Sequence, residues 1–245
     1  MAKSQKTDRR AVVDQLRSKQ KSAERRRNSM IVGVALVIAL LIVGAAAYRP
    51  IMNWWDVRKF NDIDLATIGA PATACEDVTT KPADGGSDHV APGTPMTYPD
   101  SPPAYGQHWE VWDGMERKFY TAADRPELGM LVHNLEHGHT ILWYDETVAA
   151  DSSMMSDVRG IAKKFEGTSN LRMKFKAVPW TSEDGDPFPD GQHVAFSHWS
   201  VGGADAGEGG EQVGVWQYCS EPSGEALQQF MTDYPYMDSP EPLVK

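Results

Sequence analysis

Three of the seven histidines fall within one short stretch, His133-Asn134-Leu135-Glu136-His137-Gly138-His139. On a helix, His133 and His137 would lie one turn apart on the same face, with Glu136 beside them. Two neutral imidazoles and a nearby carboxylate are ligands that suit a divalent transition metal such as zinc or copper. The stretch therefore predicts a metal site in which Glu136 is either a ligand or a general base.

His108 is the natural further ligand, because it ends a second unusual segment, Pro102-Pro103-Ala104-Tyr105-Gly106-Gln107-His108. His193 and His198 have opposite parity along one expected strand, so at most one of them can face the same way. Eleven methionines would suit copper, but Met154 and Met173 belong to apolar stripes and are better explained as core residues. The predicted ligand set is His108, His133, Glu136 and His137.

Two other interpretations of these residues stay open. The spacing H-x-x-E-H is that of the inverzincin peptidases, in which Glu136 would be the general base and a downstream acid a third ligand. The downstream candidates Glu208 and Glu211, however, lie in a Gly-rich segment without helical periodicity. In the second interpretation the cluster is structural: His133, Asn134 and Glu136 would bond buried backbone at a helix-to-strand turn, with Gly138 as a left-handed cap.

The elements that must position these residues follow from periodicity. Apolar residues at helical spacing predict a helix over 151–167 and another after Pro222, besides a short one over 125–137. Apolar runs predict buried strands over 138–144, 192–199 and 213–218. Together they indicate an α+β domain, a mixed sheet with two or three packed helices.

The segment 171–177 alternates between apolar and basic residues. Such alternation is typical of a strand with one face in the core and one in water. We therefore expect Arg172, Lys174 and Lys176 to face solvent. The preceding stretch 81–107 is rich in Pro and Gly, which favours loop backbone, and its aromatic neighbours favour an ordered segment wrapped over the domain.

An uncharged apolar segment precedes this domain. Residues 30–47 would span roughly 27 Å as a helix, enough for a thin hydrocarbon core. Residues 1–29 carry ten Lys and Arg against three acidic residues, which predicts a cytoplasmic tail. Tyr48, Trp54 and Trp55 follow as an interfacial belt would. The alternative is a signal peptide cleaved near Ala45–Ala47, although the basic region is long for one.

These features divide the chain into four parts. They are a basic cytoplasmic tail (1–29), a single transmembrane helix (30–48), a juxtamembrane helix with a Pro/Gly-rich linker (49–97) and an extracytoplasmic domain (98–245). Residues 30–245 carry 14 basic residues against 31 acidic ones, which argues against nucleic acid as a partner. Outside the cytoplasm, Cys75 and Cys219 would form one disulfide, and the absence of a Cys-x-x-Cys motif excludes thioredoxin-type redox chemistry.

Two motifs, PPxxGxH over 102–108 and HNLEHG over 133–138, follow the single apolar helix. In this combination the chain resembles a bacterial family of single-pass membrane proteins that carry a domain of unknown function. It departs from the family's first motif at Ala104 and Tyr105, where the family has Thr and Ser. The resemblance spans roughly 98–242 and implies a membrane-anchored extracytoplasmic domain of unassigned activity.

The sequence leaves two functions to compare. The first is a binding or accessory module for another envelope protein, without enzymatic activity. Aromatic residues would suit its interface but would equally suit a core, namely Trp109, Trp112, Trp143, Trp180 and Trp199. The second is a metal-binding or metal-dependent hydrolytic domain that uses His108, His133, Glu136 and His137.

Overall fold

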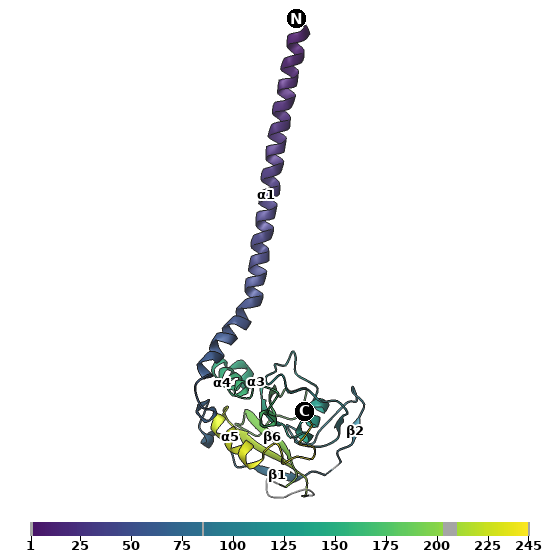
Figure 1. The fold of residues 1–245 in the computed structure, drawn as a ribbon, viewed down its shortest axis with the longest axis vertical. Helices are drawn as coiled ribbons and strands as arrows, with labels where there is room; N and C mark the ends of the chain where they lie inside the picture. The colour runs from purple at the N-terminus through teal and green to yellow at the C-terminus, as the bar shows by residue number, and fades with distance from the viewer. Residues whose placement is uncertain (1, 85, 203–209, 245) are drawn as a thin grey trace. The chain divides into compact units, whose positions relative to one another are not determined.

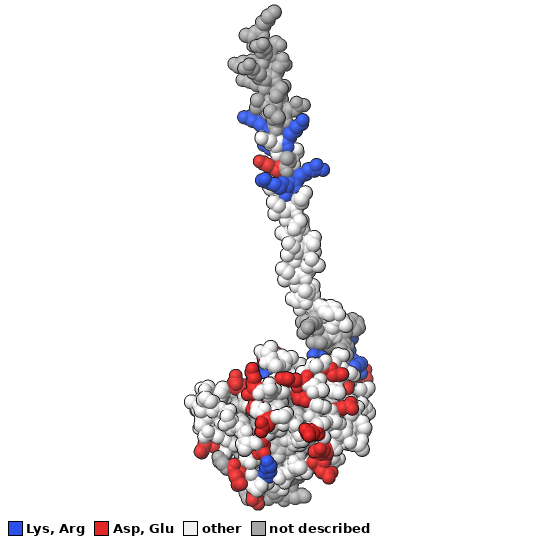
Figure 2. Space-filling model, turned by 180° about the vertical axis from the view of Figure 1, so that it is seen from behind, with Lys and Arg blue, Asp and Glu red and all other residues white. Residues whose placement is uncertain are grey.

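The computed structural model describes residues 2–84, 86–202 and 210–244 and divides into two units, residues 1–55 and 56–245 (Figure 1). Helix α1 (Ala2–Val57) contains the segment Lys19–Tyr48, the one helix among the described residues that is long and apolar enough to cross a membrane. The length and composition of this segment are compatible with a membrane span and with a signal sequence. Basic side chains flank its amino side (Figure 2). The side chains of Trp54 and Trp55 lie outside the described residues.

The second unit is built on a five-stranded sheet. Its strand order is β1 (Thr79–Pro82), β7 (Val213–Cys219), β6 (Val194–Ser200), β4 (Thr140–Tyr144) and β5 (Phe175–Pro179). Every neighbouring pair is antiparallel except β4 and β5, which are parallel. The expected α+β class with a mixed sheet is therefore confirmed.

Helices cover both faces of this sheet. Helices α3 (Glu146–Ala150), α4 (Ser152–Lys163) and α5 (Gly224–Asp233) pack on one face, and α2 (Leu128–Glu136) packs on the other. The side chains of β4 alternate between the two cores, with Leu142 and Tyr144 in one and Ile141 and Trp143 in the other. Because both faces are buried, β4 is a continuous apolar run. Short 3₁₀ turns complete the unit at Arg58–Phe60, Leu65–Thr67, Ala72–Ala74 and Leu171–Met173.

Side-chain caps explain where two of the predicted helices begin. The Asp151 carboxylate accepts hydrogen bonds from the backbone N–H groups of Ser153 and Met154, so α4 begins there. The Ser223 hydroxyl accepts from the N–H of Ala226 and sets the start of α5. Helix α3 was not expected. Asp145 caps the first turn of α3, and α3 ends two residues before α4 begins.

The prediction that Lys174 and Lys176 face solvent is wrong. Residues 171–173 form a 3₁₀ turn, β5 begins at Phe175, and both lysines are fully buried. The reason is that distant segments cover the outer face of β5. The Lys176 ammonium donates to the Asp113 carboxylate (2.5 Å) and to the carbonyl of Gly114, while Lys174 donates to carbonyls of the C-terminal segment.

Lys118 is also buried, and the buried lysines predict how the free energy of unfolding depends on pH. Burial lowers the pKa of Lys118 and of Lys174 to about 8, whereas an unfolded chain keeps these protons until about pH 10.4. Between these values the unfolded state binds more protons, so the free energy of unfolding rises with pH, by at most about 3 kcal/mol for each lysine. Above about pH 10 the trend reverses, because burial raises the pKa of Tyr218 to about 12 and the unfolded tyrosine ionises first.

Urea unfolding of the full chain at pH 8, 9 and 10 measures this dependence. The midpoint is expected to move to higher urea from pH 8 to pH 10, and the shift should be smaller in a Lys118→Met variant. A midpoint that falls steadily over this range would contradict the lowered pKa values of the buried lysines.

The Pro/Gly-rich segment is an ordered wrap, as its aromatic neighbours indicate. The indole N–H of Trp216 donates to the carbonyl of Pro102 (2.7 Å), and the Tyr218 hydroxyl donates to that of Ser101 (2.8 Å). Pro102, Pro103 and Ala104 are buried against the sheet. Of the five tryptophans considered for an interface, Trp143, Trp180 and Trp199 are core residues. Trp112 is 37% exposed.

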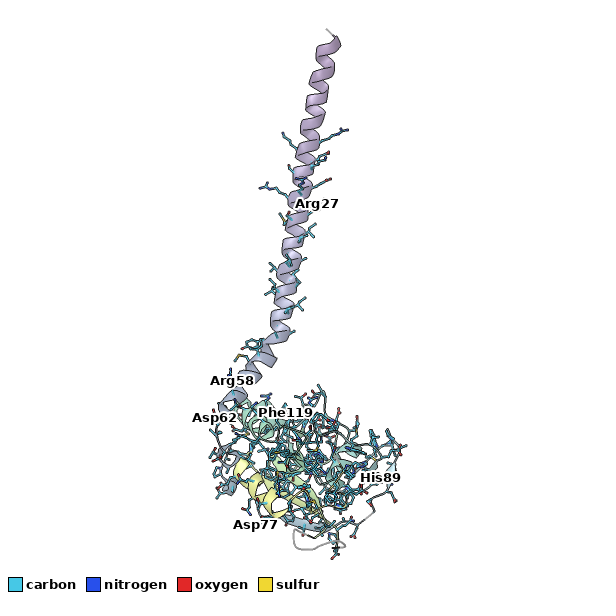
Figure 3. All side chains as sticks on the ribbon, in the orientation of Figure 1. Arg27, Arg58, Asp62, Asp77, His89 and Phe119 are labelled. Atoms are coloured by element: carbon cyan, nitrogen blue, oxygen red, sulfur yellow. A yellow bond between two sulfur atoms is a disulfide. The ribbon has the colours of Figure 1, made fainter. Side chains whose placement is uncertain are left out.

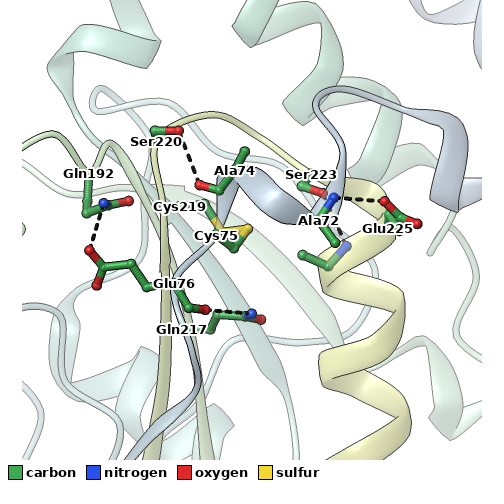
Figure 4. The surroundings of a disulfide bond; sticks show 11 residues. Ala72, Ala74, Cys75, Glu76, Gln192, Gln217, Cys219, Ser220, Ser223 and Glu225 are labelled. Carbon is green, nitrogen blue, oxygen red and sulfur yellow. Dashed lines mark hydrogen bonds between the residues drawn. A yellow bond between two sulfur atoms is a disulfide. The ribbon is translucent and has the colours of Figure 1, made fainter.

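A disulfide joins Cys75 to Cys219 at the end of β7, as the cysteine count predicts (Figure 4). Beside it, the N–H and the hydroxyl of Ser220 both donate to the carbonyl of Ala74. The bond thus ties the segment before β1 to the far end of the sheet. Such a bond is typical of domains outside the reducing cytoplasm.

Candidate metal centre

The HNLEHG motif forms the end of α2 and the turn after it. The N–H of Gly138 donates to the carbonyl of Leu135, and that of His139 donates to Asn134, which together make a Schellman cap. Gly138 has φ +82°, and a Cβ there would lie 2.2 Å from the carbonyl oxygen of Tyr236. Glycine is therefore required both by the backbone conformation and by the close approach of the C-terminal segment.

Helix α2 places three of the predicted ligands side by side. His133 and His137 lie one turn apart, and their Nε2 atoms are 3.0 Å from each other. At the other end of the helix Gly129 allows the indole of Trp109 to approach closely, since a Cβ there would lie 2.6 Å from it. This contact sets α2 against β3 (His108–Trp109).

A second, two-stranded sheet brings in a histidine that the sequence did not single out. Strand β2 (His89–Val90) pairs in parallel with β3, so His89 is opposite His108. The Nε2 atoms of the two rings are 3.2 Å apart. His89 thus joins His108 at the edge of the predicted site.

Four donor atoms converge where these elements meet. The potential ligand atoms of His89, His108, His133 and Glu136 all lie within 4.8 Å of one another. The Glu136 Oε2 atom is 3.0 Å from His108 Nε2 and 3.4 Å from His89 Nε2. In a tetrahedral zinc site with Zn–N bonds of 2.0–2.1 Å, neighbouring ligand atoms lie roughly 3.3 Å apart. The spacing of these side chains therefore suits a single divalent ion between them.

Hydrogen bonds to backbone carbonyls orient two of the rings. His108 Nδ1 donates to the carbonyl of Gly106 (2.8 Å), and His133 Nδ1 donates to that of Trp109 (2.5 Å). A neutral imidazole with its proton on Nδ1 carries a lone pair on Nε2, the form that binds metals. In both rings Nε2 faces the cluster. A lone pair that faces the Glu136 carboxylate needs a cation between them, either a proton or a metal ion.

Burial keeps the imidazoles of α2 neutral. It lowers the pKa of His133, and it lowers the pKa of His137 to about 3, with a further contribution from the positive charge of Lys174. Trp112 packs against both rings, with ring centroids 5.0 and 4.8 Å away. Neutral histidines do not have to lose a proton before they bind a metal.

The other histidines are outside the cluster. His139 and His198 are fully buried, and His198 Nε2 donates to the carbonyl of Asp238 (2.6 Å). His193 bonds the carboxylate of Asp145 instead. Neither His193 nor His198 therefore faces the predicted site.

The described part of the chain does not assemble the peptidase geometry around Glu136. Of its proposed third ligands, Glu208 lies outside the described residues. Glu211 belongs to neither group of potential ligands found among the described residues. The structural interpretation is confirmed in part, since His133 bonds backbone and Gly138 caps the helix. The hydrogen bond from His133 to the carbonyl of Trp109 also orients the His133 ring so that its Nε2 atom faces the cluster.

The site opens to solvent on one side. The side chain of His89 is 41% exposed, whereas those of His108 and Glu136 are buried. Figure 3 shows His89 at the rim of the domain. An ion from solution would therefore reach the site past His89 and be held by buried donors behind it.

Comparison with known proteins places this domain in a family. Residues 89–244, more than half of the chain, match the family described as a protein of unknown function, DUF3105. The chain belongs to the DUF3105 family. Neither a curated protein nor a solved structure matches it. The DUF3105 match begins at His89, earlier than the resemblance over 98–242 indicated, and so it includes every residue of the site.

Two residues of the candidate metal-binding groups in this DUF3105 domain were missed from the sequence. His89 lies 19 positions before His108, in a stretch without periodicity, and the pairing of β2 with β3 cannot be read from composition. Glu241 lies near the C-terminus, where its carboxylate is 3.4 Å from His137 Nε2. His89 would have been included if every histidine of the chain, and not only those near the two motifs, had been treated as a possible ligand. Nothing in the local sequence indicates Glu241.

Proposed function

We propose that this DUF3105 domain binds a divalent transition metal, zinc or copper, through His89, His108, His133 and Glu136. One observation carries the proposal. Three imidazoles and a carboxylate from three separate elements converge, and backbone carbonyls hold two of the rings with Nε2 directed inward. Imidazole and carboxylate donors suit Zn²⁺ and Cu²⁺. His137, which was expected in the same set, is assigned a different role below.

The geometry favours metal holding over hydrolysis. Glu136 Oε2 lies as close to two ring nitrogens as neighbouring ligands of one ion do, so Glu136 acts as a ligand and not as a general base. Four protein ligands fill a tetrahedral zinc site, whereas catalytic zinc usually keeps one position for water. We therefore propose a protein that holds or carries a metal.

The proposed setting is the outer face of the cell membrane. The apolar part of α1 would be a single span, with the basic tail in the cytoplasm by the positive-inside rule. The disulfide supports an oxidising compartment for the domain. An accessory role for another envelope protein is a prediction that agrees with metal carriage, because a carrier must meet its recipient.

Metal titration of the full chain, purified in a mild detergent and stripped with a chelator, tests the proposal. At least one equivalent of Zn²⁺ or Cu²⁺ is expected to bind. At 100 times its dissociation constant the ion should stabilise the fold by about 2.7 kcal/mol and raise Tm by roughly 5–10 °C. Mg²⁺, which prefers oxygen ligands, serves as the control and should leave Tm unchanged. Binding of less than about a tenth of an equivalent of either metal would end the proposal.

A further inference from the structure

A second group of ligand atoms lies directly beside the first. The potential ligand atoms of Glu136, His137 and Glu241 are within 4.8 Å of one another, and Glu136 belongs to both groups. His137 Nε2 is 3.4 Å from the Glu241 carboxylate and 3.0 Å from His133 Nε2. Because the hydrogen bond to Trp109 fixes the His133 lone pair on Nε2, His137 Nε2 faces that lone pair and the Glu241 carboxylate, and a proton or a metal ion must lie between these groups.

Glu241 is held in this position by backbone contacts rather than by its own side chain. Its N–H donates to the carbonyl of Glu136 (2.9 Å) at the end of α2. The residues that follow Glu241 are held by the buried ammonium of Lys174, which donates to the carbonyls of Pro242 (2.7 Å) and Val244 (2.6 Å) and also to that of His137 (2.5 Å). The C-terminal segment is thus fixed against α2, and the Glu241 carboxylate is free to act as a ligand.

The second group, like the first, is open to solvent on one side. The His137 side chain is 1% exposed, whereas that of Glu241 is 49% exposed, so the second group reaches from the buried helix end to the surface. A carboxylate has two oxygens and can bind one ion with each. Ions that share a bridging carboxylate lie roughly 3.5–4 Å apart.

We propose that Glu136, His137 and Glu241 hold a second divalent transition-metal ion, with the Glu136 carboxylate shared between the two ions. This inference rests on the proposed function, because it requires an ion in the first site. It makes His137, which is not a ligand of the first site, a ligand of the second. It also makes the C-terminal segment part of the metal centre.

The stoichiometry of binding tests this inference. The full chain in detergent, titrated with Zn²⁺, should bind two equivalents. The Glu241→Gln variant, which keeps the size of an exposed side chain, should bind one equivalent tightly and the second at least roughly tenfold more weakly. Glu166→Gln is the matched control, since the Glu166 side chain is 68% exposed and contacts Lys163 far from the site in sequence. That variant should bind as the wild type does.

A second measurement detects the proximity of the ions directly. Two Cu²⁺ ions at the proposed separation should give a spin-coupled electron paramagnetic resonance spectrum, and Glu241→Gln should give the spectrum of an isolated ion. One equivalent in the wild type, with an isolated-ion spectrum, would overturn the second site and leave the first intact. No bound metal at all would overturn both.

Discussion

Replacing His133 with alanine is expected to weaken Zn²⁺ or Cu²⁺ binding by at least roughly 100-fold, which corresponds to about 2.7 kcal/mol. His133 contributes a donor atom to the first site, and its ring is fixed by the hydrogen bond to the carbonyl of Trp109. Removal of one ligand leaves three, and it also takes away the stabilisation of the metal-bound fold. Isothermal titration of the full chain measures the affinity, and Tm with and without metal measures the stabilisation.

Because His133 is buried, its removal also lowers the stability of the metal-free protein, so a second variant separates the two effects. The His89 side chain is 41% exposed, and His89→Ala should leave the metal-free Tm nearly unchanged while it still weakens metal binding. His193→Ala is the matched control, because His193 bonds Asp145 outside the cluster. If both His133→Ala and His89→Ala bound the metal as tightly as the wild type, the ligand assignment would be wrong.

The elements with strong local signals were predictable. Helix α4 begins at the capping residue Asp151 and keeps Val158 and Ile161 on its buried face, as the helical period requires. Strand β4 is buried on both faces and was identified by its apolar run. The His-x-x-Glu-His spacing correctly brought the histidines and the carboxylate of α2 together. In each case the information lies within a few consecutive residues.

The parts that were missed depend on contacts between segments far apart in the chain. His89 reaches the site because β2 pairs with β3, a pairing of two residues in each strand with no periodicity to detect. Lys174 and Lys176 follow an alternation that usually marks a solvated face, but Asp113 and the C-terminal segment cover them. A local pattern records the polarity of a side chain. It does not record which distant segment will neutralise or cover that side chain.

Buried Lys174 connects the segments that carry His137 and Glu241 to the sheet. Lys174 bonds three carbonyls and, within residues 2–84, 86–202 and 210–244, no carboxylate, so it anchors backbone from α2 and from the C-terminal segment to β5. Burial of an ammonium is unfavourable unless its donors are satisfied. Lys174 therefore holds the end of α2 and the C-terminal segment together in the metal-free domain, although burial of its ammonium opposes folding.

Removing the disulfide is expected to lower the free energy of unfolding by about 5 kcal/mol. Cys75 and Cys219 are separated by 144 positions, and in the chain-entropy model a loop of this length restricts the unfolded state strongly. The Cys75→Ser, Cys219→Ser double variant avoids an unpaired thiol. Urea unfolding of the full chain, with a two-state fit, measures the loss, and reduction of the wild type should reproduce it.

The hydrogen bonds around the disulfide provide the control for this prediction. Ser220 donates through its hydroxyl to the carbonyl of Ala74 beside the bond, and Ser220→Ala should cost about 1 kcal/mol, as one partly buried hydrogen bond does. A loss in the double variant no larger than this would mean that contacts of β1 and the preceding turns already hold the segment to β7. The disulfide would then add little to the fold. A loss near the full value would instead make the oxidising compartment a requirement for the stability of the domain.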